Sequence, residues 1–377
     1  MNEGYPEYIS GVPVPASSSK PITGLEHVKS IAAGSNHLLA LTQDGKVLSF
    51  GSNMYGQLGQ GADNADRLHP IGTWSGLDAM FPSYGRTYAI KDGDLWVMKD
   101  GGATQAVLLG QKAFKVVEAL GHYAVLTEDG RLLVPDPEEA KSCKVIQAPG
   151  PVKDVSATMN GILVALMDGR VYYVQGYFTS LDAEVELKFE PKPKGNSVQV
   201  TGDPIPFVLT DQGELYYKER TEDGKPLMKL VNTEAPLKRW SPAHYVFFDG
   251  IGYVGKALDT NGQVIDIEVS LQRDGHVENE KAAVKSHPTG RKAVVLTGGA
   301  EIGADGRIFD GNNRIRSDAA MPEGEKLHAY ASLYHFPIEG RSYFRHIFIT
   351  DKGTIYWLGD LPVSYWRPTA KEVTVRN

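Results

Sequence analysis

Residues 37–50 read HLLALTQDGKVLSF: an apolar run, a tight turn that ends in glycine, and a second strand-like run. An Asp-Gly pair between two such runs is a strong hairpin signal, because glycine reaches positive φ at little steric cost. The same arrangement recurs along the chain, with turn glycines at Gly45, Gly93, Gly130, Gly169, Gly213, Gly262, Gly306 and Gly353. The sequence therefore predicts eight copies of one β-hairpin.

The spacing of these glycines indicates how the hairpins are organised. Successive turn glycines are 48, 37, 39, 44, 49, 44 and 47 residues apart. A period in the forties that carries hairpins is typical of a β-propeller, whose four-stranded blades each take about 40–50 residues. We predict an all-β chain, a single propeller domain over residues 1–377, with eight blades. The copies around Gly262 and Gly306 match less well, so seven blades are the alternative.

The strands and the chain ends lead to three more expectations. The first strand of each hairpin is almost wholly apolar, which suits a strand covered on both faces by neighbouring sheets. Residues 367–377, RPTAKEVTVRN, can supply a strand beside the first blade, so that N- and C-terminal strands close the ring and remove exposed sheet edges. Residues 1–20 are expected to be extended or poorly ordered.

Residues 28–61, VKSIAAGSNHLLALTQDGKVLSFGSNMYGQLGQG, carry a longer motif around the first hairpin. This segment closely resembles the repeat of the regulator of chromosome condensation (RCC1) family, with Phe50 where tryptophan is usual. The matching positions are Gly34, His37, Gly45, Gly51, Asn53, Gly56, Gln57, Leu58 and Gly59, and His122 partly repeats the histidine. The resemblance implies an RCC1-like β-propeller in which each histidine fixes its own blade through backbone hydrogen bonds. Beyond this repeat only the hairpin is shared, so the resemblance implies no particular partner.

Bulk composition limits the classes of function. The chain has 39 basic and 46 acidic residues and a formal charge of -7, which argues against non-specific binding to nucleic acid or anionic lipid. No run of 18 apolar residues is present, so we expect no transmembrane helix. The first ten residues show neither a basic nor an apolar region of a signal peptide, so none is expected. A native start at Met1 would indicate the cytoplasm, whereas a start added to a mature chain would leave secretion or the cell surface open.

A glycine-rich stretch raises the question of nucleotide binding. Residues 249–257, DGIGYVGKA, contain both GxGxxG and GxxxxGK. Phosphate loops of these kinds need a following helix, whose N-terminal amides hold the anion. The next residues, LDTNGQVIDI, instead read as another turn and strand. We interpret the stretch as a strand connection.

Candidate catalytic and metal-binding residues are few. His37 and His122 both lie eight residues before their turn glycines, and two histidines at one repeat position could bind a metal at a common centre. The structural role is the preferred interpretation, because the sequence has no HExxH motif and no CxxC pair. Cys143 is the single cysteine and lies in a polar stretch without a nearby histidine, so we expect a half-buried thiol rather than a nucleophile. We therefore expect no catalytic residue, no metal and no cofactor.

The hairpin geometry predicts where a partner would bind. If every Asp-Gly turn lies on one face, the second strand of each hairpin ends on the opposite face, where the variable connectors begin. These connectors are 51–70, 97–113, 134–151, 174–198, 217–236, 268–292, 310–328 and 358–371. Large aromatic residues lie in some of them: Tyr55, Tyr177, Phe178, Tyr365 and Trp366. Residues 273–292, the most polar connector, are expected to form a mobile loop.

The function hypothesis follows from this geometry. We predict a non-enzymatic, monomeric propeller that binds another protein through the face opposite the Asp-Gly turns, with Tyr177, Phe178, Tyr365 and Trp366 in contact. Two alternatives are implied by the resemblance: a guanine-nucleotide exchange factor for a small GTPase, or an inhibitor of a secreted enzyme. A third alternative, an enzyme with its site at the central channel, has no motif in its support. Nucleic acid and membrane are not expected as partners.

Overall fold

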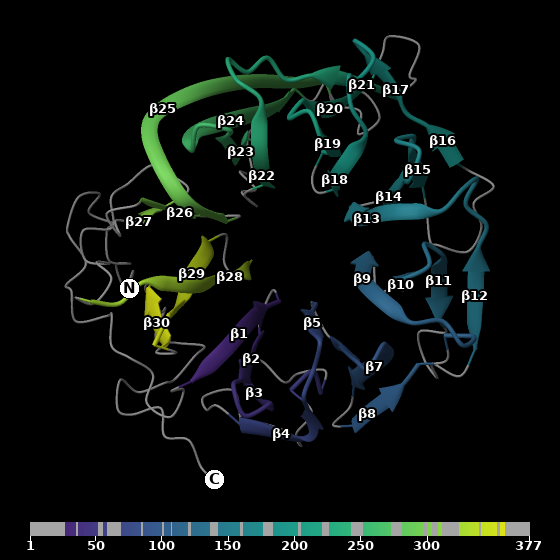
Figure 1. The fold of residues 1–377 in the computed structure, drawn as a ribbon, viewed down its shortest axis with the longest axis vertical. Coiled ribbons are helices and arrows are strands. Elements are labelled where there is room, and N and C mark those ends of the chain that lie inside the picture. The colour runs from purple at the N-terminus through teal and green to yellow at the C-terminus, as the bar shows by residue number, and fades with distance from the viewer. Residues whose placement is uncertain are drawn as a thin grey trace, which may run out of the picture.

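The computed structural model describes residues 27–358, except for 35–36, 52–55, 59–68, 84–85, 100–101, 107, 120–121, 136–141, 159–160, 176–183, 203–204, 221–225, 243–251, 273–280, 298–299, 304–307, 311–323, 339–340 and 353–354. These described residues form thirty β-strands and no helix. Figure 1 shows the strands as sheets set around a common centre, with β1, β5, β9, β13, β18 and β22 nearest to it. The all-β prediction is confirmed, and the arrangement is that of a β-propeller.

Four of the sheets have four strands each, in sequence order from the centre outward. The first is β1 (Val28–Ala33), β2 (His37–Thr42), β3 (Lys46–Gly51) and β4 (His69–Ser75). The second is β5 (Ala79–Pro82), β6 (Thr87–Lys91), β7 (Asp94–Lys99) and β8 (Gly102–Gln105). The third is β9 (Ala113–Ala119), β10 (His122–Thr127), β11 (Leu132–Pro135) and β12 (Cys143–Ile146). The fourth is β13 (Val152–Thr158), β14 (Gly161–Leu166), β15 (Val171–Gln175) and β16 (Glu184–Glu186).

The other three sheets depart from this pattern. The fifth contains β17 (Lys188–Glu190), β18 (Ser197–Thr201), β19 (Phe207–Thr210), β20 (Leu215–Arg220) and β21 (Pro226–Leu230), with β17 parallel to β21 at the outer edge. The sixth contains β22 (Leu237–Pro242), β23 (Gly252–Asp259), β24 (Gln263–Gln272), β25 (Lys281–Thr297), β26 (Ala300–Gly303) and β27 (Ile308–Asp310). The seventh contains β28 (Leu327–Ile338), β29 (Arg341–Thr350) and β30 (Ile355–Leu358).

All eight predicted hairpins are present as antiparallel strand pairs: β2–β3, β6–β7, β10–β11, β14–β15, β19–β20, β23–β24, β26–β27 and β29–β30. In the six hairpins whose turn is described, the turn glycine has φ between 77° and 88°, which is the conformation that favours glycine. The first strands are buried as predicted: every residue of β2 and β14 is buried. Apolar clusters join neighbouring sheets, as Leu126 of β10 does with Val155 and Val164 of the next sheet.

The turn glycines also link each sheet to the next one. In five hairpins the glycine carbonyl accepts a hydrogen bond from a backbone N–H at, or just before, the start of the next innermost strand. The pairs are Gly45 with Gly76, Gly93 with Ala113, Gly130 with Val152, Gly213 with Leu237, and Gly262 with Ala293, at 2.8–3.1 Å. At Gly169 the hydroxyl of Ser197 donates instead, at 3.1 Å. The uniform Asp-Gly turns therefore connect neighbouring sheets as well as the two strands of a hairpin.

One prediction about the connectors was wrong. Residues 281–292, expected within a mobile loop, belong to β25, a strand of 17 residues. Its first part pairs with β24, and from Ala293 onward it pairs with β26, so it passes from the outside of one hairpin to the inside of the next. Figure 1 shows this long curved strand. Its polar composition reflects an outer position, because every residue from 284 to 292 is exposed or half-buried.

The blade count and the closing of the ring stay predictions. The hairpins favour eight blades, with β25 shared between two of them. Strands β1 and β28, from the first and the seventh sheet, contact each other. The proposed closing strand at residues 367–377 and the segment 1–20 lie outside the described residues. The single-domain boundary of 1–377 is likewise a prediction.

Candidate partner-binding surfaces

The ring has two faces, which we call the Asp-Gly face, after its turns, and the loop face, opposite to it. Strand β15 ends at Gln175, which pairs with Gly161 at the far end of its hairpin from the turn. Strand β30 likewise ends at Leu358, paired with His346. Both strands therefore end toward the loop face. Tyr177, Phe178, Tyr365, Trp366 and Tyr55 lie outside the described residues, so their role in binding stays a prediction.

The repeat histidine joins two sheets. His37 of β2 is fully buried, and its Nε2 lies 2.7 Å from the hydroxyl of Thr87 on β6. The same hydroxyl donates to the backbone carbonyl of Gln57, also at 2.7 Å. A threonine hydroxyl has only one proton, so its oxygen accepts from His37, and Nε2 must carry the hydrogen. We expected the histidine to bond to the backbone of its own blade, and that stays a prediction; its bond to Thr87 joins it to a side chain of the neighbouring sheet.

Burial keeps this histidine neutral. Desolvation lowers the pKa of His37 from 6.5 to about 3, because an imidazolium would lose its hydration inside the protein. The ring is therefore uncharged at neutral pH and acts as a hydrogen-bond donor. This geometry gives the repeat histidine a structural role.

The glycine-rich corner closes around this contact. Gly56 has φ 71°, and the Gln57 and Leu58 that follow it are buried. Ser49 of β3 donates to the carbonyl of Leu58 at 3.3 Å. At Gly34 the next sheet approaches closely, since a Cβ there would lie 2.7 Å from the carbonyl oxygen of Ser83. The corner is thus part of the contact between the first and second sheets.

The remaining motif positions divide into two groups. Gly45 and Gly51 belong to the first hairpin, in its turn and at the end of β3. His122 is the first residue of β10 and pairs with Ala119, as expected for its place in the repeat, but its side chain lies outside the described part of the structure. Asn53 and Gly59 also lie outside it.

The GxGxxG stretch forms a strand, as its following residues predicted. Gly252 begins β23 and Gly255 lies within it, paired with Pro242 and Ile267. The indole of buried Trp240 covers Gly255, because a Cβ on that glycine would lie 1.8 Å from Cη2 of the ring. Gly255 therefore provides room for a tryptophan rather than for a phosphate.

Substitution of this glycine gives a first test. We expect Gly255→Ala to lower the free energy of unfolding by about 1–3 kcal/mol, since the added methyl group must displace the indole. Urea unfolding followed by tryptophan fluorescence would measure the loss. Gly290, which has φ 73° and open space around it, is the control for a glycine replaced without a clash, because only backbone strain is added there. Equal stability of Gly255→Ala and the natural chain would contradict the packing role.

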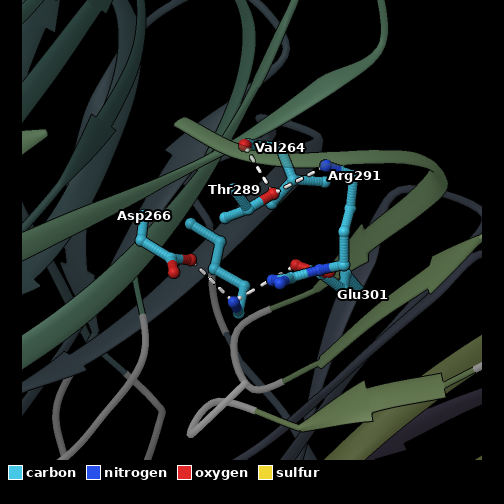
Figure 2. Close-up of polar contacts among 6 residues, drawn as sticks. Val264, Asp266, Thr289, Arg291 and Glu301 are labelled. Carbon is cyan, nitrogen blue, oxygen red and sulfur yellow. Dashed lines mark hydrogen bonds and ion pairs between the residues drawn. The ribbon is translucent and has the colours of Figure 1, made fainter. Parts of the chain in front are cut away.

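A buried group of four charges joins β23, β24, β25 and β26 (Figure 2). Lys256 is 1% exposed, and its Nζ lies 2.7 Å from Asp266 Oδ1 and 3.2 Å from Glu301 Oε2. Glu301, also 1% exposed, forms a second ion pair with Nε of Arg291. The backbone N–H of Arg291 donates to Thr289, whose hydroxyl donates to the carbonyl of Val264 at 2.9 Å. Two cations and two carboxylates thus balance one another where β25 changes partner.

Other possible reactive or binding features are limited in the described part of the chain. Burial raises the pKa of the half-buried Cys143 thiol from 9.0 to about 11, so the thiolate is scarce at neutral pH, as expected for a non-nucleophilic cysteine. Among the same residues no three His, Cys, Asp or Glu side chains are grouped as metal ligands. A search of the described residues also found no helix that is long and apolar enough to cross a membrane.

Two sequence comparisons cover the first hairpin and its corner. Two family models for the regulator of chromosome condensation (RCC1) repeat match residues 28–57 and 44–73. The chain carries an RCC1 repeat. A 43-residue stretch is also 54% identical to the guanine nucleotide exchange factor SRM1 of Saccharomyces cerevisiae. That match spans 11% of this chain and only 9% of the yeast protein.

Structural comparisons place the RCC1 repeat in a propeller. Prp20p from Saccharomyces cerevisiae, described for its binding to Gsp1p and histones, superposes with a TM-score of 0.51 at 12% identity, covering 72% of this chain and 80% of Prp20p. The WD40 domain of SCAP from fission yeast gives a TM-score of 0.50 at 10% identity, covering 90% and 94%. The computationally designed Ika8 protein gives 0.52 at 14% identity, covering 90% and 98%. At these identities the likeness shows the fold alone.

Sequence reasoning found the RCC1 repeat histidine but missed its partner and the charged group. Thr87 lies fifty residues from His37 and is one of several threonines, so nothing marked it. The charged group takes its members from four strands, and Lys256 was considered only as part of a glycine-rich motif. An isolated lysine within an apolar strand was the one available signal.

Proposed function

We propose that this chain is a non-enzymatic, RCC1-like propeller that binds a partner protein through its loop face. One observation carries the proposal: on the Asp-Gly face the carbonyls of turn glycines accept hydrogen bonds from the next sheet. The turns of that face therefore hold neighbouring sheets together. The connectors that leave the opposite edge vary in length and composition. Variable loops on a rigid scaffold are the usual place for recognition.

The aromatic residues of these connectors are the proposed contacts. Tyr177 and Phe178 follow β15, and Tyr365 and Trp366 follow β30. Tyrosine and tryptophan are enriched in binding hot spots, because they bury a large area and keep a polar group. We propose that the chain acts as a monomer, needs no cofactor and binds neither nucleic acid nor membrane.

A triple-alanine variant tests the loop face. Replacing Tyr177, Phe178 and Trp366 with alanine is expected to weaken partner binding about 30-fold or more, since hot-spot residues contribute about 2 kcal/mol or more each. Affinity for a partner purified with the natural chain would be measured by calorimetry. Phe114→Ala, an exposed aromatic on the Asp-Gly face, is the matched control and should leave that affinity unchanged. Unchanged affinity of a folded triple variant would refute the proposed face.

Guanine-nucleotide exchange is the second candidate. It is supported by the match to a yeast exchange factor, which is 54% identical over 43 residues. The matched repeat itself forms a contact between two sheets in this structure. Release of fluorescent GDP from purified small GTPases, with and without the chain, is the direct assay. Acceleration of release would make the partner a GTPase. Unaccelerated release across the panel would exclude exchange on those GTPases and leave the binding proposal intact.

A further inference from the structure

The innermost strands share a β-bulge on the Asp-Gly face. In six of them the register skips the second residue, so that the first and third residues pair with successive residues of the partner strand. In β25 the same shift skips Val294, one residue after the strand begins to pair with β26. The skipped residues are Lys29, Phe114, Lys153, Val198, Lys238, Val294 and His328. We call these residues the bulge ring. Bulges of this kind re-aim a side chain and occur at the rims of closed sheets and near functional sites.

The exposure of the second residue is a consequence of the fold. In four of these strands the residue before the bulge, namely Ala113, Val152, Leu237 or Ala293, is buried and donates its N–H to the preceding turn glycine. The following residue is then turned out of the sheet toward solvent. Its position is fixed by the sheet contact, but the type of its side chain is not. An apolar side chain at such a position therefore has no packing reason within the ring.

Apolar residues nevertheless occupy half of the ring positions whose side chains are described. Phe114 is 59% exposed, Val294 is 62% exposed and Val198 is 39% exposed. Lysines occupy the other three, with Lys29 and Lys238 exposed and Lys153 half-buried. From β9 to β25, lysine and apolar residues alternate on successive innermost strands. Exposed Leu109 and Met167 lie on the same face, in the link before β9 and in the turn after β14.

The turns that surround the bulge ring carry charges of both signs. In three of the surrounding turns an acidic residue is paired within its own turn: Asp44 with Lys46 at 2.9 Å, Asp129 with Arg131 at 3.1 Å, and Asp168 with Arg170 at 2.7 Å. Further inward, Lys115 pairs with Asp154 at 2.6 Å. The bulge ring therefore presents lysines and apolar groups beside turns that pair part of their own acidic residues, although the whole chain carries a formal charge of -7.

We propose that the bulge ring is a second docking surface, for an acidic protein segment with apolar side chains between its carboxylates. This second surface goes beyond the proposed function, because the bulge ring lies on the Asp-Gly face and the proposed partner binds the loop face. Charge complementarity selects carboxylates for the lysines, and the exposed Phe114, Val198 and Val294 require apolar contacts. A nucleic acid fits less well, since sequence-tolerant binding of single strands uses several aromatic stacking platforms, and the described part of the ring has one.

Short peptides provide the test. A labelled eight-residue peptide of alternating glutamate and leucine, roughly 26 Å long when extended, is titrated with the full chain in low salt. The proposal predicts saturable binding that weakens about tenfold or more when leucine is replaced by serine or glutamate by lysine, and that weakens with added salt. A labelled oligothymidylate of 16 nucleotides is titrated in parallel. Saturable binding of the oligonucleotide without binding of the acidic peptide would overturn the proposal.

Variants assign the binding to the ring. The double variant Lys153→Glu with Lys238→Glu should bind the acidic peptide about tenfold or more weakly than the natural chain does. The double variant Phe114→Ser with Val294→Ser should lose affinity to a similar extent. Lys285→Glu, an exposed lysine on the outer part of β25, is the matched charge control and should have no effect. Thermal unfolding confirms that each variant is folded; because all these residues are at the surface, single replacements remain usable if a pair fails to fold. Equal loss in Lys285→Glu, or no loss in the ring variants, would overturn the assignment.

The two faces are tested independently. The triple-alanine variant of Tyr177, Phe178 and Trp366 should bind the acidic peptide as the natural chain does. Loss of partner binding in that variant with retained peptide binding would support both surfaces. Failure of the peptide to bind would leave the loop-face proposal untouched.

Discussion

Acidification below pH 6.5 is expected to lower the free energy of unfolding by about 1.4 kcal/mol per pH unit through His37 alone. The pKa of His37 is lowered from 6.5 to about 3 in the folded protein. Between these values the unfolded chain binds the proton and the folded chain does not. The contribution of His37 is therefore fully present above pH 6.5 and is lost as the pH falls toward 3.

A glutamine at this position separates the histidine from other acid-sensitive groups. His37→Gln has no group to titrate, so the slope of stability against pH between 4 and 6 should decrease by close to one proton relative to the natural chain. Urea unfolding at a series of pH values would measure both slopes. Val294→Gln, at an exposed position of β25 without a titratable group, is the control and should keep the natural slope. An unchanged slope in His37→Gln would show that His37 is not the buried neutral donor described above.

Lys256→Met is expected to destabilise the protein by about 3–5 kcal/mol, because it leaves the carboxylate of Asp266 buried without its cation. Asp266 is only 8% exposed, and its Oδ1 accepts from Lys256 Nζ at 2.7 Å. Glu301 would keep its ion pair with Arg291. The loss would be measured by urea unfolding at neutral pH.

A second substitution distinguishes lost charge balance from lost packing. Adding Asp266→Leu to Lys256→Met removes the buried Asp266 carboxylate that has lost Lys256. The double variant should therefore be more stable than Lys256→Met alone. The matched control is the exposed pair Lys188 and Glu186, 3.1 Å apart, where Lys188→Met should cost about 0–1 kcal/mol. A double variant less stable than Lys256→Met would contradict the account of the charged group.

The hairpins could be predicted from the sequence, because their signal is local. An Asp-Gly turn between two apolar runs specifies the turn, its glycine conformation and the pairing of two strands. Strands β17 and β25 could not be predicted in this way. Strand β17 pairs with β21 at the outer edge of the fifth sheet, and β25 passes from the outside of one hairpin to the inside of the next. No local turn signal specifies pairing of that kind. The polar residues of β25 also resemble a loop, because one side of an outer strand faces solvent.

The candidate surfaces could be predicted less completely. The structural role of His37 followed from the family resemblance, but its bond to Thr87 arises only when the first two sheets come together. The bulge ring left no trace in the sequence, since the skipped residues are lysine, valine, phenylalanine and histidine with no common motif. A bulge is a property of strand register, and register is set by the turn and the sheet contact rather than by the bulged residue.

Binding of a partner protein through the loop face is the central claim, and site-specific photo-cross-linking tests it most directly. Benzoylphenylalanine would be placed at Phe178 or Trp366 on the loop face, at Phe114 in the bulge ring, or at Lys285 on the outer edge, and each chain irradiated in extract of the source organism. The claim predicts one shared cross-linked protein from positions 178 and 366 that is absent from position 285. The same products from positions 178, 366 and 285, or a specific product from position 114 alone, would contradict it.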